Sequence, residues 1–260
     1  MMERVTTDDG IDLHIEIEGA EGAPVLLLSN SLGTRLEMWA PQVEALTSRY
    51  RLVRYDSRGH GRSGASVGDY TIERLGLDAV AILDALNVPR ARFCGLSMGG
   101  MVGMWLGTHE PERLERLVLA NTAAWMGPPE AWQGRIEAVL RDGVGAITEA
   151  VVERWFTPGF RARALETVVG MIDTLRITPP GGYAGCCAAI RDMDQRETIR
   201  AIRAPTLVIG GAQDPATPLA KAQEIAEAIA GARLIVLDAA HLSNIEQPEA
   251  FTAALIEFLK

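Results

Sequence analysis

Cysteine, long apolar segments and an excess of basic residues are all missing or scarce in this chain of 260 residues. Its three cysteines are Cys94, Cys186 and Cys187, and neighbours in sequence such as the last two rarely form a disulfide. We therefore expect reduced thiols and a cytoplasmic protein. The N-terminus lacks the apolar segment of a secretory signal, and the apolar run from Val25 to Leu28 is far too short to span a bilayer. The sequence thus predicts no membrane partner.

The charge balance is acidic, with 25 Lys and Arg against 34 Asp and Glu and a formal net charge of −9. A protein that binds nucleic acid needs a basic surface to replace the counterions of the phosphates. The composition therefore argues against nucleic acid and leaves small molecules as the expected partners. It does not predict an oligomeric state.

Short apolar segments alternate with helical patterns along most of the chain, which predicts parallel βαβ units. The fold class expected is α/β, with a doubly wound and mostly parallel sheet. Strands are predicted at 11–17, 24–29, 51–55, 91–94, 114–120, 205–209 and 232–237, and helices at 71–87, 98–107, 218–230 and 248–259.

This alternation stops between residues 125 and 195, where helical patterns occur without a convincing strand. An insert of this kind between two parts of a parallel sheet is typical of a cap over the carboxyl ends of the strands. We therefore expect a core made of residues 1–124 and 196–260 and a helical cap made of residues 125–195.

The clearest catalytic signal is Gly95-Leu96-Ser97-Met98-Gly99, which follows a predicted strand and opens a predicted helix. In this context G-x-S-x-G is typical of the nucleophile turn of α/β-hydrolases, where small neighbours allow a tight turn that exposes the serine. The helix N-terminus beneath it favours developing negative charge. We interpret Ser97 as the nucleophile.

A nucleophilic serine needs a histidine base and an acid that orients it, and in this fold they follow in the order Ser, acid, His. Asp214 and His241 each follow a predicted strand, so both should lie at the sheet edge where Ser97 emerges. Asp238 is a weaker candidate for the acid, because it lies too close to His241 along the chain.

The other three histidines have simpler interpretations. His14 lies on the polar side of a predicted strand and His109 at the end of a predicted helix. His60 lies in a glycine-rich loop and is interpreted as a hydrogen-bonded structural residue. This leaves His241 as the base.

A tetrahedral oxyanion requires two backbone N–H donors. One should come from Met98, the residue after the nucleophile. The second should come from the loop at residues 29–34, which follows the predicted strand at 24–29. Related hydrolases often carry His-Gly where this chain has Asn30-Ser31, and by analogy with them the second donor is the N–H of Leu32.

Several segments resemble the 3-oxoadipate enol-lactonases of the β-ketoadipate pathway, and the resemblance extends from about residue 10 to the C-terminus. The nucleophile turn is common to the whole superfamily, whereas the loop at 28–34 and the cap segments are narrower signals. The segments are Leu28–Thr34 with Met38-Trp39, Gly95–Gly100, Asn121–Ala124, Arg154–Pro158, Gly182-Tyr183 with Cys186-Cys187, and Ala240–Gln247.

This resemblance implies an α/β-hydrolase that opens an enol-lactone carrying a carboxylate side chain, giving 3-oxoadipate without a metal or organic cofactor. Ser97 would attack the lactone carbonyl while His241 takes its proton. Trp39, Trp125 and Trp155 are the tryptophans expected at the substrate. A carboxylesterase or lactonase acting on a less charged substrate is the alternative, and a ligand-binding protein of the same fold is a third possibility.

One position departs from the family. Enol-lactonases usually carry Lys or Arg where this chain has Trp125, and that cation would meet the substrate carboxylate. Arg35, Arg135 or Arg191 would then have to supply the charge from elsewhere. Two interpretations stay open: the indole only packs between cap and core, or the pocket prefers a less charged acyl group.

Overall fold

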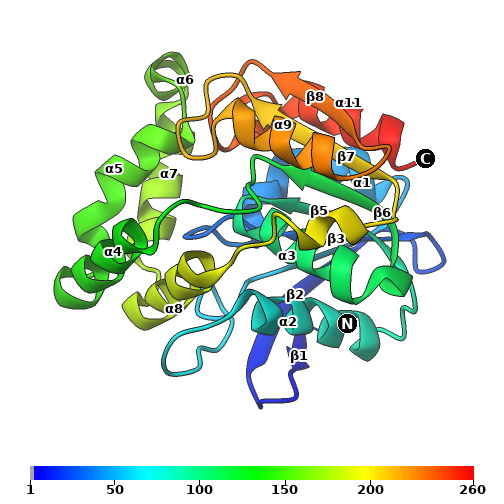
Figure 1. The fold of residues 1–260 in the computed structure, drawn as a ribbon, viewed down its shortest axis with the longest axis horizontal. Coiled ribbons are helices and arrows are strands. Elements are labelled where there is room, and N and C mark those ends of the chain that lie inside the picture. Colours follow the sequence, from blue (N-terminus) through cyan, green and yellow to red (C-terminus); the bar gives the residue numbers. More distant parts are fainter. Residues whose placement is uncertain (1–2) are drawn as a thin grey trace.

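A single sheet crosses the centre of the molecule in the computed structural model, which describes residues 3–260 (Figure 1). Within these residues eight strands have the order β1-β2-β4-β3-β5-β6-β7-β8. The first two pairings are antiparallel and the others are parallel, so the expected mostly parallel sheet is confirmed. The strands are β1 (Arg4–Thr6), β2 (Asp12–Glu18), β3 (Val25–Ser29), β4 (Arg51–Tyr55), β5 (Ala91–Leu96), β6 (Leu114–Ala120), β7 (Thr206–Gly211) and β8 (Arg233–Leu237).

Helices cover both faces of this sheet, as a doubly wound fold requires. Helices α1 and α11 pack against each other on one face, whereas α2, α3 and α9 cover the other (Figure 1). Helix α10 is short and lies between β8 and α11 along the chain. The bounds are α1 (Ala40–Thr47), α2 (Ile72–Ala85), α3 (Met98–His109), α9 (Leu219–Ala228), α10 (Ser243–Glu246) and α11 (Pro248–Phe258).

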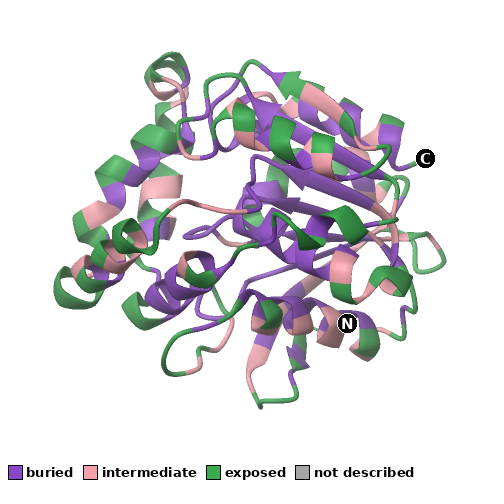
Figure 2. Cartoon of the chain, viewed as in Figure 1, coloured by how far each residue is buried: buried purple, intermediate pink, exposed green. Residues whose placement is uncertain are grey.

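The central strands are hydrophobic without alternation because both of their faces are covered. Leu26, Leu27 and Leu28 of β3 are fully buried, and Figure 2 shows the central strands as the buried interior of the chain. Helix α3, which follows β5, is buried on nearly every side. The nucleophile turn between β5 and α3 is therefore anchored in the most buried part of the molecule.

Five further helices lie together at one side of the sheet (Figure 1, left). They occupy the segment for which the sequence predicts a cap. Helix α8 begins at Pro180, where proline suits the first helical position, and it packs against α4. The bounds are α4 (Pro129–Asp142), α5 (Thr148–Trp155), α6 (Pro158–Arg163), α7 (Leu165–Arg176) and α8 (Pro180–Asp192).

The sequence did not predict β1 or α1, which are short elements with weak patterns. Four short 3-10 helices were also not predicted: η1 (Leu36–Trp39), η2 (Pro111–Arg113), η3 (Val144–Ile147) and η4 (Thr198–Ala201).

The predicted helix at 71–87 is α2, capped at its start by Thr71, whose hydroxyl accepts the N–H of Arg74 at 3.0 Å. Asn87, at φ 54°, lies just beyond its end.

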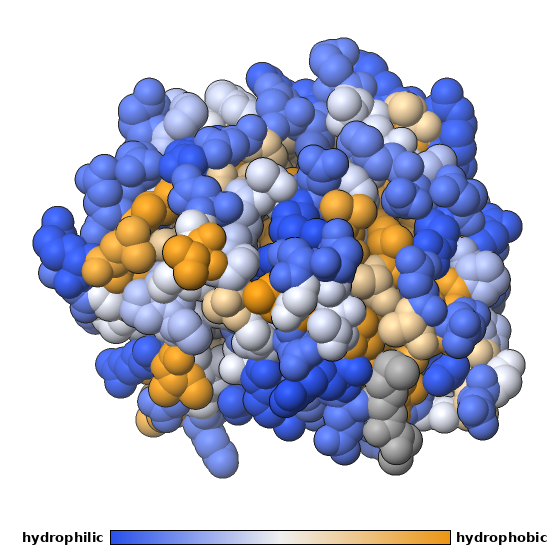
Figure 3. All heavy atoms as spheres, turned by 90° about the horizontal axis from the view of Figure 1, so that it is seen from below, coloured by the Kyte–Doolittle hydropathy of each residue, from blue (hydrophilic) through white to orange (hydrophobic). Residues whose placement is uncertain are grey.

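The outer surface carries mixed polarity. The face in Figure 3 is mostly hydrophilic, with separate hydrophobic patches. Within residues 3–260, every helix is too short or too polar to cross a membrane.

Candidate active site

Ser97 lies in a tight turn between β5 and α3 with an unusual backbone conformation. Its φ of 57° and ψ of −116° are strained for a residue with a side chain. A Cβ on Gly95 would lie 2.0 Å from the carbonyl oxygen of Gly99, and a Cβ on Gly99 would lie 2.1 Å from that of Ser29. The two glycines are therefore required for the turn to close, as the motif predicted.

Ser97, His241 and Asp214 form a continuous chain of hydrogen bonds. His241 Nε2 lies 2.8 Å from Ser97 Oγ, and His241 Nδ1 lies 2.8 Å from Asp214 Oδ2. All three residues are buried although they come from three separate turns of the chain. Because the ionised carboxylate can only accept, Nδ1 carries the proton and Nε2 is free to accept the proton of Ser97.

The Asp214 carboxylate is held by donors on both oxygens. Oδ1 accepts the N–H groups of Ala216 and Thr217 at 2.8 and 3.0 Å, and Oδ2 accepts the Thr217 hydroxyl at 2.7 Å. Burial opposes ionisation, but electrostatic attraction to His241 and the hydrogen bonds from His241, Asn121 and the Thr217 backbone together lower the pKa of Asp214 to about 2. The carboxylate is thus ionised at neutral pH and oriented toward the imidazole.

Asn121 is a further contact of Asp214 that sequence reasoning did not assign. It follows β6 in the left-handed region at φ 44°, which asparagine tolerates better than most residues. Its Nδ2 donates to Asp214 Oδ2 at 2.9 Å, and its Oδ1 accepts the hydroxyl of Ser243 at 2.5 Å. The only signal in the sequence was its place in a segment that resembles the enol-lactonases.

Two backbone N–H groups beside Ser97 have no acceptor. Within residues 3–260, neither Leu32 nor Met98 donates its N–H to another group of the chain. The loop that carries Leu32 is fixed on both sides, because Asn30 accepts the N–H of Gly99 at 2.9 Å and Gly33 donates to His60 Nε2 at 3.0 Å. Unpaired N–H groups at this place are what an oxyanion site requires.

His60 supports this loop as a neutral, buried residue. Its Nδ1 lies 3.2 Å from the carbonyl oxygen of Arg58, which can only accept, so Nδ1 carries the proton and Nε2 accepts from Gly33. Burial lowers the pKa of His60 to about 4. The structural interpretation of His60 agrees with these contacts.

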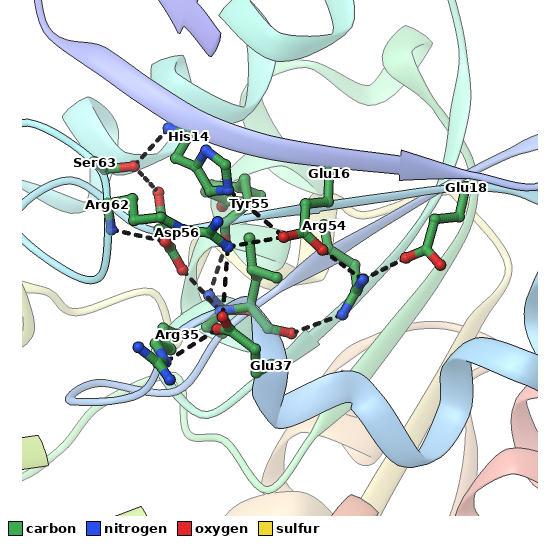
Figure 4. Close-up of polar contacts among 12 residues, drawn as sticks. His14, Glu16, Glu18, Arg35, Glu37, Arg54, Tyr55, Asp56, Arg62 and Ser63 are labelled. Carbon is green, nitrogen blue, oxygen red and sulfur yellow. Dashed lines mark hydrogen bonds and ion pairs between the residues drawn. The ribbon is translucent and has the colours of Figure 1, made fainter. Parts of the chain in front are cut away.

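The loop that carries His60 is itself held by a buried carboxylate (Figure 4). Asp56 Oδ1 accepts the N–H of Leu36 at 2.8 Å, and Oδ2 accepts that of Arg62 at 2.8 Å. Ser63 donates its hydroxyl to the Asp56 carbonyl at 2.6 Å. Burial raises the pKa of Asp56. These contacts join the loop after β4 to the segment that follows the oxyanion loop.

Ser97 and His241 open onto a cavity of about 460 Å³ between the sheet edge and the helices α4, α5 and α8. One wall comes from the strand ends and the turns after them, and the opposite wall comes from residues 126–190. The lining residues are Ser31, Leu32, Ser97, Met101, Pro215, Ala216 and His241 on one side and Met126, Ala131, Trp132, Arg135, Ile147, Ala150, Val151, Arg154, Trp155 and Ile190 on the other.

The three expected tryptophans are placed differently from one another. Trp155 lines the cavity. Trp39 does not, because its ring is fully buried and its Nε1 donates to Asn30 at 2.9 Å. Trp125 is also not among the lining residues, and its ring lies 4.4 Å from the guanidinium of Arg196. Of the three expected tryptophans only Trp155 is thus among the lining residues, and Trp132 is a lining tryptophan that the sequence did not single out.

Two arginines line the cavity without a carboxylate partner among residues 3–260. Arg135 was one of the candidates for anion recognition, whereas Arg154 was not. Partial burial and the nearby charge of Arg135 lower the pKa of Arg154. The other two candidates are engaged elsewhere, Arg35 with Glu37 at 3.1 Å and Arg191 with acidic neighbours outside the cavity. The cavity thus has an uncompensated positive charge.

Asp238 is excluded as the orienting acid by its position. Its Oδ1 accepts the side-chain amide of Gln213 at 2.7 Å on the exposed surface, whereas the contact to His241 Nδ1 is made by Asp214.

A family model described as alpha/beta hydrolase fold matches residues 24–248, and the chain therefore belongs to the α/β-hydrolase fold family. Its similarity extends to particular members. The chain is 43% identical over 254 residues to 3-oxoadipate enol-lactonase 2 of Acinetobacter baylyi, a match that covers 98% of this chain and 95% of that protein.

Solved structures are similar over the same length. The enol-lactonase from Burkholderia xenovorans superposes with a TM-score of 0.97 at 44% identity, covering 98% of this chain and 99% of that one. A hydrolase from Pseudomonas aeruginosa superposes with a TM-score of 0.96 at 48% identity, covering 98% and 97% respectively. The resemblance to enol-lactonases that the sequence suggested is confirmed.

Proposed function

We propose that this chain hydrolyses a lactone by a Ser-His-Asp mechanism, and that the substrate is 3-oxoadipate enol-lactone. The observation that carries the proposal is the hydrogen-bonded chain Ser97–His241–Asp214 opening onto a cavity with two unpaired guanidinium groups. The relatives named as enol-lactonases support the choice of substrate.

In the first step His241 Nε2 takes the Ser97 proton as Ser97 Oγ attacks the lactone carbonyl. Asp214 stabilises the imidazolium that forms, and the N–H groups of Leu32 and Met98 stabilise the oxyanion. The ring C–O bond then breaks, and the enolate leaves as part of the same molecule because it remains tethered to the acyl group. It takes a proton from the imidazolium and becomes the ketone by tautomerisation.

In the second step water attacks the ester formed between Ser97 and the acyl group. His241 removes a proton from the water, which attacks the acyl carbon, and the bond to Ser97 Oγ breaks as the serine regains a proton. The released product carries a new carboxylate, formed from the acyl group that was bound to Ser97, and retains the carboxylate of the substrate. No metal or organic cofactor takes part in this proposal.

Arg135 and Arg154 are the residues we assign to the substrate carboxylate. An anion between two guanidinium groups relieves their mutual repulsion, and charge-assisted hydrogen bonds of this type contribute about 1.5–3 kcal/mol. Trp155 and Trp132 would contribute apolar contact to the lactone ring. We propose that residues 125–195 act as the cap of this site, because they supply the wall that faces Ser97.

The three thiols support the proposed cytoplasmic location. Cys94, Cys186 and Cys187 are free and buried, as expected where disulfides do not form.

The test compares kcat/KM on the carboxylated enol-lactone with kcat/KM on a neutral lactone of the same ring size. Arg135→Met and Arg154→Met should each lower kcat/KM about tenfold to a hundredfold on the carboxylated substrate, while activity on the neutral one is nearly unchanged. Arg141→Met, on the exposed face of α4, is the matched control.

Two outcomes would contradict the proposal at different levels. Equal kcat/KM values, or a preference for the neutral lactone, would support a carboxylesterase or lactonase for less charged substrates instead. Activity of Ser97→Ala equal to that of the wild type would refute the serine hydrolase mechanism itself.

A further inference from the structure

Two segments that resemble the enol-lactonases meet at the edge of the cavity, and each contains residues that the proposed reaction does not use. One is the cap segment at 154–158 and the other is the segment at 240–247 that contains His241. They are joined directly by the backbone, because the N–H of Leu242 donates to the carbonyl oxygen of Trp155 at 3.0 Å.

Glu246 makes the second connection between these segments. It lies at the end of α10 and only 5% of it is exposed. Its Oε1 accepts the hydroxyl of Thr157, and its Oε2 accepts the N–H groups of Ala240 and Thr157 at 3.0 and 3.3 Å. Within residues 3–260 the carboxylate has no cationic partner, so these neutral donors hold it.

The two connections lie on either side of the general base. Ala240 precedes His241 and is joined to Thr157 through the Glu246 carboxylate, whereas Leu242 follows His241 and donates directly to Trp155. The same cap segment contributes Arg154 and Trp155 to the cavity wall. A shift of this segment would therefore move the backbone of His241 and the substrate contacts together.

We propose that Glu246 is a positioning residue that couples the docking of the cap segment to the placement of His241. The inference rests on the proposed function, since it concerns the base of that reaction. A carboxyl group without a cationic partner is costly to bury unless hydrogen bonds compensate it, and here those bonds join two parts of the chain that form opposite walls of the site.

Variants at Thr157 and Glu246 separate hydrogen bonding from packing and charge. Thr157→Val removes the hydroxyl but keeps the backbone N–H, whereas Thr157→Ser keeps both donors. Glu246→Gln keeps an oxygen that can accept both N–H groups and an amide that can donate to Thr157 Oγ1. Glu246→Leu leaves all of these donors unpaired.

Two rates are measured for each variant: lactone turnover, as kcat and KM, and the second-order rate at which a fluorophosphonate modifies Ser97. The fluorophosphonate needs His241 as base but carries no carboxylate for the cap arginines. Thr157→Val should lower kcat and the phosphonylation rate by a similar factor, on the order of tenfold, with KM within about threefold. Thr157→Ser and Glu246→Gln should remain close to the wild type.

A double-mutant cycle tests the coupling. Thr157→Val should cause no further loss of kcat in the Glu246→Leu background, because the contact to Glu246 is already absent. The remaining contact of the Thr157 hydroxyl, in which it accepts the N–H of Phe160 at 3.2 Å, caps α6, which contributes no residue to the cavity wall. If Glu246→Leu does not fold, the comparison of Thr157→Val with Thr157→Ser alone decides whether kcat depends on the Thr157 hydroxyl. The matched control is Gln42→Leu, which removes buried hydrogen bonds between α1 and Asn244 of α10 without touching the cap, and it should keep the wild-type kcat.

Three results would overturn the inference: additive effects in the cycle, a loss in KM alone with normal phosphonylation, or an equal loss of kcat in Gln42→Leu. None of them bears on the proposed function, which fails if Ser97→Ala retains activity, if the wild type opens no lactone, or if its kcat/KM on the neutral lactone equals or exceeds that on the carboxylated one. The two failures are therefore distinguishable in the same set of assays.

Discussion

Replacing His60 by leucine should disturb the oxyanion loop while leaving the Ser97–His241–Asp214 chain in place. His60 does not contact the reacting serine. It acts on the site through Gly33, whose N–H it accepts at 3.0 Å and which directly follows the donor Leu32. The variant thus tests the support of the oxyanion loop separately from the residues that transfer the proton.

The expected losses of stability and of kcat follow from the two hydrogen bonds of the imidazole. Leucine leaves the buried Gly33 N–H without a partner, at a cost of about 1–3 kcal/mol in the free energy of unfolding, and leaves the Arg58 carbonyl with only the weak thiol donor of Cys186 at 3.8 Å. Complete removal of one oxyanion donor lowers kcat by about 10²–10³. Because Leu32 is loosened but still present, we expect a loss of kcat of about tenfold to a hundredfold.

Glutamine at this position is the conservative comparison. Its amide presents an acceptor and a donor on neighbouring atoms, as the neutral imidazole does, so it can pair with both Gly33 and Arg58. His60→Gln should therefore stay within about tenfold of the wild-type kcat.

The neutral state of His60 also predicts a pH dependence of stability. Its pKa is about 4 in the folded chain against 6.5 in the unfolded chain, a difference worth about 3 kcal/mol. Between these values the unfolded chain binds a proton that the folded chain does not, so the free energy of unfolding falls as the pH decreases from 6.5 to 4. His60→Gln lacks this proton and should lose less stability over the same range.

The assays are kcat and KM on the lactone, affinity for a boronic acid that forms a tetrahedral adduct with Ser97, and urea unfolding at pH 7 and pH 4.5. His109→Gln is the control, since His109 is an exposed histidine at the end of α3. A kcat for His60→Leu within threefold of the wild type, or unchanged boronate affinity, would refute the role of His60 in the oxyanion site.

Three further predictions test other contacts of the site. Asn121→Gly keeps the left-handed backbone but removes one hydrogen bond from Asp214, so kcat should fall about tenfold with little change in KM; a change in KM alone would contradict this. Gly99→Ala places a Cβ 2.1 Å from the Ser29 carbonyl and must displace β3 or the turn, so it should cost about 1–3 kcal/mol in unfolding free energy and lower kcat; a crystal structure with an unmoved turn would show the reasoning to be wrong. Trp125→Ala and Trp125→Arg should change kcat/KM on the carboxylated lactone by less than about threefold, because the ring contacts Arg196 outside the cavity; a large gain with arginine would mean that position 125 reaches the substrate.

The sequence by itself determined the parts of the site that depend on local chemistry and chain order. The turn at Ser97 requires small residues two positions away on each side, and those are visible within five residues. Asp214 and His241 were identified because each follows a predicted strand, and the carboxyl ends of parallel strands meet at one edge of the sheet.

Only the tertiary structure decided which side chains support these groups and which face the substrate. The contacts of His60 with Gly33, of Asn121 with Asp214 and of Glu246 with Thr157 join residues 27, 93 and 89 positions apart, so no local pattern reveals them. The cap shows the same limit. Its helices carry several arginines and tryptophans, and their packing against the sheet edge turns Arg135, Arg154 and Trp155 toward the cavity, because the rotation of a helix is set by the surfaces it buries. Trp125 lies in the loop before α4, and its contact with Arg196 is likewise set by the tertiary structure.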